Sequence, residues 1–145
     1  MLSDTAFKPD ARNKSSYFRS IVNLSTSLRE AHITVYSVRL PDPSRTQVRA
    51  YMYQDYLKGI ASPKEAAPGD LALQVLAVQS GGLTLGPDGD PVSHMNACVA
   101  DASGYYELTF EASTGKTVDD YHEVAIRMER PGLTARTRNG YYTQP

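Results

Sequence analysis

The sequence contains no tryptophan, a single cysteine, no long apolar run and no excess of one charge. The one cysteine, Cys98, excludes an internal disulfide, so neither an oxidising nor a reducing compartment is favoured. No segment approaches the roughly 18 consecutive apolar residues of a membrane span. The polar stretch from Met1 to Ser16 lacks the apolar centre of an export signal. The net charge of -1 gives no field that would attract nucleic acid or an anionic membrane.

What the sequence does contain is typical of one folded domain. A chain of 145 residues with 41% hydrophobic and 21% charged residues is large enough for a single core. Tyrosine is abundant, with 10 residues against 3 phenylalanines, and its amphipathic ring suits half-buried strands and contact surfaces. Residues 1–14 carry few apolar side chains, so we expect a flexible arm there.

The stretch from Leu71 to Phe110 organises the rest, because helix and strand signals alternate along it. Asp70 stands where it would cap a first helix, and Gly81-Gly82 ends that helical pattern. Leu83 to Leu85 then predicts a short strand.

A second helix and a longer strand complete the stretch. Asp90 supplies a capping carboxylate, and Pro91 suits the first helical position. A strand-like alternation then runs from Tyr105 to Glu111. The apolar positions of the helix are expected to share one face: Met95, Cys98, Val99 and Ala102.

The preceding segments predict one more helix and one more strand. A helix is expected from Ser15 or Ser16 to about Ala31. Its apolar face contains Phe18, Ile21, Val22, Ser25 and Leu28. His32 to Leu40 is rich in β-branched and aromatic residues, which indicates a strand covered on both faces in a parallel sheet.

Two regions are less regular. Within residues 41–70, helical spacing extends only from about Gln47 to Lys58, and a connection this long either carries function or is mobile. His122 to Arg130 and Leu133 to Arg138 alternate as strands around Pro131-Gly132, which has the residues of a type II turn. We therefore predict an antiparallel hairpin with one wet face.

Two motifs resemble ligand-binding loops but lack essential parts. Ser113 to Thr117 ends like a phosphate-binding loop, yet Phe110 occupies the position of its first glycine and a strand pattern follows. Asn23 to Ser27 differs at one position from D-x-S-x-S, where asparagine replaces the carboxylate that hard cations prefer. A solvated turn and a polar helix surface are the favoured interpretations.

His94 and Cys98 lie four residues apart, as two metal ligands or a thiol and a base would. The other histidines, His32 and His122, begin separate predicted strands, so the sequence identifies no further ligand. Cys98 beside Met95 is therefore interpreted as a small core residue.

The last predicted strands are locally basic. The arginines are Arg127, Arg130, Arg136 and Arg138. Arginines near tyrosines can bind single-stranded nucleic acid, but acidic residues lie close by in the sequence, at Asp119, Asp120, Glu123 and Glu129. Cross-strand ion pairs are thus favoured, and we expect no nucleic-acid partner, no membrane insertion, no cofactor and no metal; no small-molecule substrate is identified.

Taken together, the order of elements resembles the C-terminal half of bacterial von Willebrand factor A (VWA) related domains, over about residues 15 to 142. The segments that carry the resemblance are Ile21 to Val38, Leu71 to Gly82, Tyr105 to Leu108, Arg130-Pro131-Gly132-Leu133 and Arg138-Asn139-Gly140-Tyr141-Tyr142. The resemblance implies a doubly wound α/β sheet, an exported protein, and binding of proteins or matrix.

Family members typically bind through a metal ion at the top of the sheet, but this chain departs from that pattern. The strand that carries D-x-S-x-S has no counterpart before Ser15, so the resemblance carries over no metal ligand. The strand from Ile33 to Val38 would then have an open edge. Another chain covers that edge, or the arm and the Tyr51 to Tyr56 region fold over it, or the sequence is a piece of a longer protein.

These observations predict a partial doubly wound, Rossmann-like α/β domain in residues 15–111, with a C-terminal antiparallel β extension in residues 112–145. The expected function is non-enzymatic protein–protein interaction or adhesion, with a protein partner or self-association. The predicted contact residues are Tyr51, Tyr53, Tyr56, Tyr141 and Tyr142.

The alternative is a small enzyme or ligand-binding domain with a cleft at the carboxyl ends of the parallel strands, near Leu40 and Gly86. Clustered titratable groups there, such as Asp88, Asp90 and His94, would favour chemistry. An exposed apolar edge without such a cluster would favour interaction.

Overall fold

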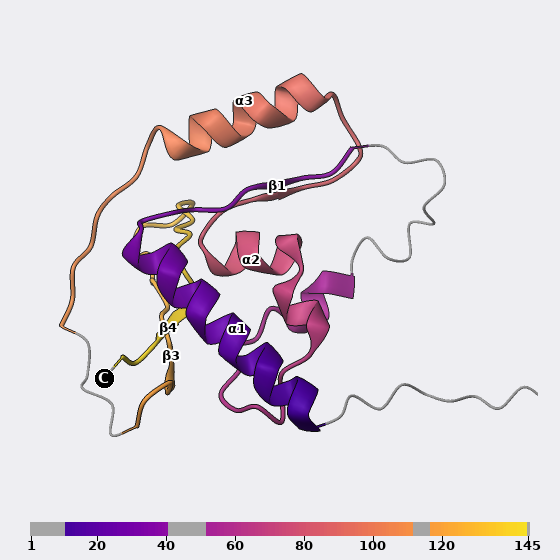
Figure 1. The fold of residues 1–145 in the computed structure, drawn as a ribbon. Coiled ribbons are helices and arrows are strands. Elements are labelled where there is room, and N and C mark those ends of the chain that lie inside the picture. Colours follow the sequence, from indigo (N-terminus) through magenta and orange to yellow (C-terminus); the bar gives the residue numbers. More distant parts are fainter. Residues whose placement is uncertain (1–10, 41–51, 112–116, 145) are drawn as a thin grey trace, which may run out of the picture.

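The computed structural model describes residues 11–40, 52–111 and 117–144, and its elements alternate between helices and short strands (Figure 1). The α-helices are α1 (Ala11–Glu30), α2 (Leu73–Gln79) and α3 (Pro91–Ala102). Two short 3-10 helices precede α2: η2 (Met52–Tyr56) and η3 (Pro68–Leu71). The strands are β1 (Ser37–Val38), β2 (Thr84–Leu85), β3 (Tyr121–Glu123) and β4 (Gly140–Tyr142).

The predicted first helix is confirmed as α1, which begins at Ala11, a few residues earlier than its serine caps suggest. It ends where His32 adopts a left-handed φ of 52°. The N–H groups of His32 and Ile33 then bond back to the carbonyls of Arg29 and Leu28, at 3.1 and 2.9 Å. These two hydrogen bonds satisfy carbonyl groups that the helix end would otherwise leave without a donor.

The central pair of strands is parallel, as predicted: Ser37 is in register with Thr84, and Val38 with Leu85. Figure 1 shows α3 on one side of this pair and α2 on the other, so the described residues form an α/β arrangement in layers. The strand predicted from His32 to Leu40 is too long. Among the described strands only β2 pairs with β1, and β2 spans just two residues, so β1 is limited to the same length.

The first of the two central helices, α2, ends as the paired glycines predict. Gly81 has a φ of +88°, and the N–H of Gly82 donates to the carbonyl of Ala77 at 2.8 Å. The predicted cap at its start is wrong. The carboxylate of Asp70 accepts the N–H of Ala67 at 2.7 Å and so stabilises η3, while α2 begins after Ala72 without a side-chain cap.

The second central helix, α3, begins as predicted: Asp90 accepts the N–H of Ser93 at 2.9 Å, and Pro91 occupies the first turn. Its expected apolar face is divided. Cys98 is buried, as interpreted from the sequence, but Met95 and Val99 are 58% and 63% exposed. The face is divided because only its Cys98 side is turned toward the strands.

The C-terminal pairing differs from the predicted hairpin. β3 pairs antiparallel with β4, with Tyr121 opposite Tyr142 and Glu123 opposite Gly140. Gly132 has the positive φ of +80° that its turn requires, but residues 124–138 form no strand. Packing between aromatic side chains accounts for the pairing of β3 with β4, since Tyr121 and Tyr142 pack edge to face with ring centroids 5.2 Å apart.

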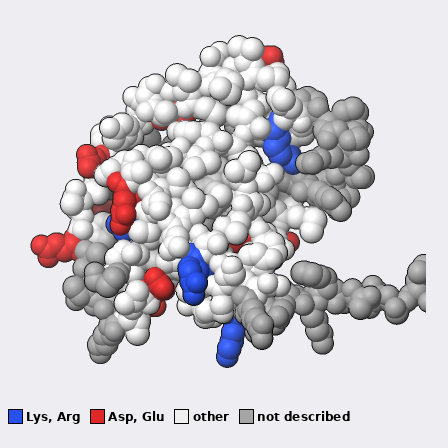
Figure 2. All heavy atoms as spheres, in the orientation of Figure 1, with Lys and Arg blue, Asp and Glu red and all other residues white. Residues whose placement is uncertain are grey.

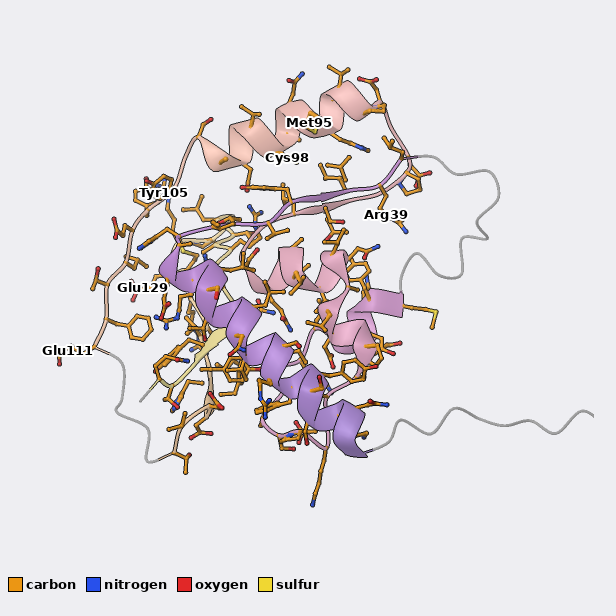
Figure 3. The ribbon with its side chains drawn as sticks, viewed as in Figure 1. Arg39, Met95, Cys98, Tyr105, Glu111 and Glu129 are labelled. Carbon is orange, nitrogen blue, oxygen red and sulfur yellow. The ribbon has the colours of Figure 1, made fainter. Side chains whose placement is uncertain are left out.

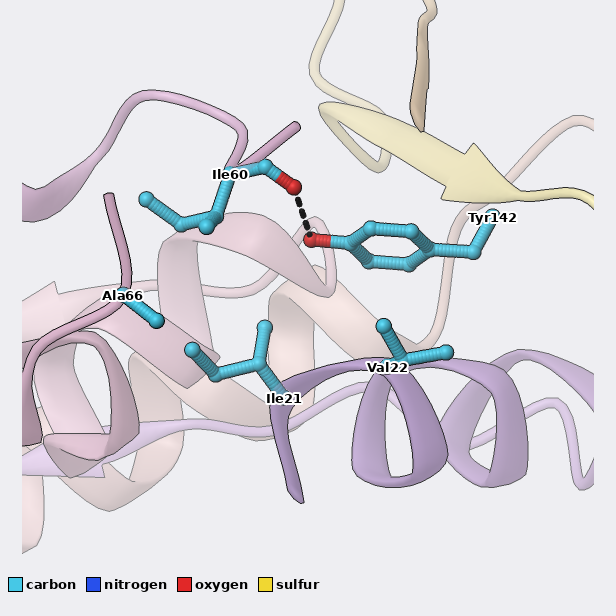
Figure 4. Close-up of a cluster of buried hydrophobic side chains, with 5 residues drawn as sticks. All are labelled: Ile21, Val22, Ile60, Ala66 and Tyr142. Carbon is cyan, nitrogen blue, oxygen red and sulfur yellow. Dashed lines mark hydrogen bonds between the residues drawn. The ribbon is translucent and has the colours of Figure 1, made fainter. Parts of the chain in front are cut away.

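The core lies between α1, the loop after η2, and β4 (Figure 4). Its buried side chains are Ile21, Val22, Ile60, Ala66 and Tyr142. The Tyr142 hydroxyl donates to the carbonyl of Ile60 at 3.0 Å, and Phe18 packs against the Tyr142 ring. The apolar face of α1, which the sequence predicts, thus covers β4 and the loop.

Replacing Gly82 should destabilise the fold, because an added Cβ would overlap the carbonyl oxygen of Val35. We expect Gly82→Ala to lower the free energy of unfolding by about 2 kcal/mol. Gly104→Ala is the matched control, since its Cβ would meet no atom within 4 Å. Urea unfolding measures both, and equal stability of the two variants would contradict this account of Gly82.

Two substitutions at Tyr142 separate the contribution of its hydroxyl to stability from that of its ring. Tyr142→Phe should cost about 1–2 kcal/mol, because the buried carbonyl of Ile60 loses its donor. Tyr142→Ala should cost about 3–5 kcal/mol, because it also leaves a cavity. Thermal or urea unfolding provides the measurement, with Tyr106→Ala, at a side chain 97% exposed, as the control. An unchanged Tyr142→Ala would contradict the placement of this ring in the core.

Candidate interaction surface

The tyrosines predicted as contact residues lie on different elements. Tyr53 and Tyr56 are partly buried on η2, where the Tyr56 ring lies over Gly69. Tyr141 stacks on His122 at a centroid distance of 5.2 Å. Tyr142 is 3% exposed and belongs to the core, so it contributes nothing to the surface. Tyr51 lies outside the described residues.

A larger exposed apolar region starts on α3 and continues into the chain after it. The side chains concerned are Val92, Met95, Val99, Tyr105, Tyr106, Leu108 and Phe110, and we call this set the apolar surface. Tyr106 is 97% exposed and Leu108 is 69% exposed. Figure 3 labels Met95 on α3 and Tyr105 just beyond it, and the face over α3 carries few charged side chains in Figure 2. Patches of this kind mark interaction sites on many proteins.

The second part of the apolar surface, Tyr105 to Glu111, has no strand partner among the described residues, so the strand predicted there is not formed. No backbone hydrogen bond joins it to another described segment. A ring contact joins it to the rest of the described chain, between Phe110 and Tyr141, with ring centroids 6.0 Å apart. Figure 1 shows the segment running down one side of the molecule after α3. Within the described parts of the chain, its backbone donors and acceptors therefore have no backbone partner.

Hydrogen bonds hold the end of α3 in place. Asp101 accepts the hydroxyl of Tyr36 at 2.7 Å on one oxygen and the guanidinium of Arg136 on the other. Arg136 also donates its Nε to the carbonyl of Gly81 at 2.7 Å. The bond from Arg136 lowers the pKa of Asp101, and burial together with Asp101 raises the pKa of Tyr36 to about 12. This network ties β1, α3 and the C-terminal chain together.

Arg138 anchors the same C-terminal chain to α1. Its guanidinium donates to the carbonyls of Leu28 and Ile33, at 3.1 and 2.7 Å, and its burial lowers its pKa. A cation near helix C-terminal carbonyls also interacts favourably with the helix dipole. Arg136 and Arg138 are thus used within the fold. The sequence predicts that the arginines of the last strands pair with acidic residues of the same region. This prediction is wrong for Arg136, whose partner is Asp101 in α3.

The titratable groups near the ends of the parallel strands, Asp90 and His94 among them, take part in local contacts. The pKa of Asp90 is lowered by hydrogen bonds from Ser93, which belong to its capping role. His94 lies close to Gly89, and Cys98 faces the interior. Asn23 to Ser27 lies within α1, as its helical interpretation predicts. In residues 11–40, 52–111 and 117–144, no group of three His, Cys, Asp or Glu side chains could hold a metal ion.

Two cavities lie away from these strand ends. One, of about 320 Å³, is lined by residues of η2 and the following loop, together with Asp70. Asp70 is 2% exposed and its pKa is raised by burial, but its carboxylate already accepts the N–H of Ala67. The other, of about 740 Å³, is lined by Leu57 to Gly59, β3 residues, Val124 and Asn139. The motif Ser113 to Thr117 falls largely outside the described residues.

None of the helices in the described part of the chain is long and apolar enough to cross a membrane. The comparisons with known proteins identify no relative: no protein-family model, no curated protein and no solved structure matches the chain.

The Asp101 network makes a prediction about pH. The pKa of Asp101 is lower in the folded state than in the unfolded chain, so its contribution to stability is present above its ordinary pKa and lost as pH falls through the folded value. At pH 7, Asp101→Asn should cost about 1 kcal/mol, a modest value because both partners are partly exposed.

The difference between the wild type and Asp101→Asn should shrink as the pH falls below about 4. Unfolding curves at several pH values test this, with the exposed Asp88→Asn as the control. A difference that stays constant down to acid pH would contradict the role of the Asp101 charge.

Proposed function

We propose that this chain is a non-enzymatic protein-interaction module, and that the apolar surface of α3 and residues 105–110 is where its partner binds. The observation that carries the proposal is the exposure of the seven large apolar side chains of this surface, which lie between Val92 and Phe110. Exposed apolar area of this extent is unfavourable in water unless something covers it. A protein partner would cover the side chains and pair with the backbone of residues 105–111, which bonds to no other backbone group among the described residues.

The resemblance to VWA-related domains supports the same class, because members of that family typically bind proteins or matrix. We propose that the chain corresponds to the C-terminal part of such a domain, acts in an adhesion-type role, and binds without a metal ion. Its D-x-S-x-S-like motif lies in α1, where Asn23 replaces the carboxylate. The partner's affinity would then come from apolar contact and strand pairing rather than from a shared cation.

The alternative of an enzyme or ligand-binding domain has less support. Its cleft would lie near Leu40 and Gly86, but the two cavities described above are lined by other residues. Asp90 is used as a helix cap. We therefore keep protein binding as the proposed function.

A photo-reactive amino acid placed at Tyr106 tests the proposal. In a lysate of the source organism, position 106 should cross-link one protein, or the chain itself, whereas the same group at the partly buried Tyr53 serves as the matched control. With the captured protein purified, a Tyr106→Ser and Leu108→Ser double variant should bind at least tenfold more weakly in calorimetry, since two large apolar side chains leave the contact.

Two results would contradict the proposal. The first is an affinity that the double variant does not change, which would place the contact elsewhere. The second is tight binding of Mg²⁺ or Ca²⁺ to the folded chain in a titration, because the proposed contact contains no metal ligand.

A further inference from the structure

We infer that the occupant of the 105–111 part of the apolar surface is a second copy of this chain, whose residues Tyr105 to Glu111 pair antiparallel with the same residues about a two-fold axis at Leu108. The inference rests on the proposed function and names its partner. It is carried by the composition, exposure and charge spacing of this one segment.

The segment has the properties of an unpaired strand. Its side chains alternate, with Tyr106, Leu108 and Phe110 on one face and Tyr105, Glu107, Thr109 and Glu111 on the other. It contains no lysine and no proline, the residues that proteins place on strand edges to prevent pairing. Among the described residues it has no backbone hydrogen-bond partner. The segment is therefore open to a strand from outside.

The two glutamates select the register. Antiparallel pairing about Leu108 places Glu107 opposite Thr109 of the second copy, and Glu111 opposite Tyr105. Pairing about Glu107 would place this carboxylate opposite itself, and pairing about Thr109 would place Glu107 opposite Glu111. Parallel pairing in register would also align like charges, and like charges directly opposite each other are destabilising. Of the registers centred on Glu107, Leu108 and Thr109, the Leu108 register alone keeps the carboxylates apart, and it pairs all of residues 105–111 with the same residues of the second copy.

The same register is favourable on the apolar face. Tyr106 lies opposite Phe110 of the second copy, twice by symmetry, and Leu108 lies opposite itself. Aromatic cross-strand pairs are among the stabilising ones. A register shifted by one residue would instead place the apolar face against the polar one. A surface that complements itself in this way is what a two-fold dimer requires.

The charge and the anchoring of the segment agree with a dimer. A net charge of -1 creates little repulsion between two copies. The segment is attached at one end to α3, which Asp101 and Arg136 hold in place, and its other end contacts Tyr141 through Phe110. Residues 105–111 are thus presented from a fixed base, which lowers the entropic cost of pairing.

Substitutions at the exposed Thr109 test the register, because this residue faces Glu107 of the other copy twice. Light scattering and sedimentation of the full chain should show a concentration-dependent dimer. Thr109→Lys should tighten the dimer and Thr109→Glu should weaken it, each by roughly threefold to tenfold in dissociation constant. Because Thr109 is on the surface, the thermal unfolding of each monomer should stay unchanged.

A cross-link tests the symmetry axis. Residues opposite each other in an antiparallel pair have Cα atoms about 4.5–5.5 Å apart, within the range that a disulfide spans. Leu108→Cys should therefore form a disulfide-linked dimer under mild oxidation. Thr109→Cys is the matched control, since its symmetry mate is a diagonal neighbour about 7–8 Å away and should link poorly. The wild type, whose Cys98 is buried, should not link.

Three outcomes would overturn the inference. A chain that stays monomeric at its solubility limit excludes the dimer, while the proposed function would still stand if the photo-reactive group at position 106 captures a different protein. A dimer in which Thr109→Lys and Thr109→Glu have the same effect is formed through another register or face. A Leu108→Cys variant that links no better than Thr109→Cys places the two-fold axis elsewhere.

Discussion

The hydroxyl of Tyr142 donates to the carbonyl of Ile60 while its ring packs near Ile21 and Val22, and this contact joins three distant parts of the chain. Without it, α1 would expose its apolar face, and the loop after η2 would lose the partner of a buried carbonyl. β3 depends on it as well, because Tyr121 packs against the same ring. The position of β4 therefore determines how the N-terminal helix and the middle of the chain meet.

The residues just before β4 extend this connection to the parallel strands. Arg138 reaches the end of α1, the N–H of Asn139 donates to Gln79 at the end of α2, and Arg136 reaches Asp101 at the end of α3. Each of these contacts involves the C-terminal end of a helix. Helix ends leave carbonyls without a partner, and Arg138 and the N–H of Asn139 satisfy two of them, at Leu28 and Gln79, while Arg136 pairs with the carboxylate of Asp101.

The sequence predicted the parts of this fold that depend on local chemistry. The periodic face of α1, the cap at Asp90 and the paired glycines after α2 follow from spacing, and the parallel pairing of β1 with β2 follows from a run without polar alternation. The Asp101 network and the burial of Tyr142 were missed, because they join residues far apart in the chain. Only the local excess of arginine near the end gave any signal for them. Strand lengths were overestimated because pairing requires a neighbour that composition cannot locate.

Arg136 is bonded to other parts of the fold whereas Leu108 is exposed, and this difference connects the fold to the proposed function. Arg136 and Arg138 bond to groups at or just beyond the ends of helices, whereas large apolar side chains of residues 105–110 stay exposed. If that segment were only a linker, nothing would favour aromatic residues at Tyr105, Tyr106 and Phe110, since exposed apolar area contributes nothing to the stability of the monomer. Its alternation would gain a physical use if a second strand covered one face, which is why the inference above pairs the segment with a second copy.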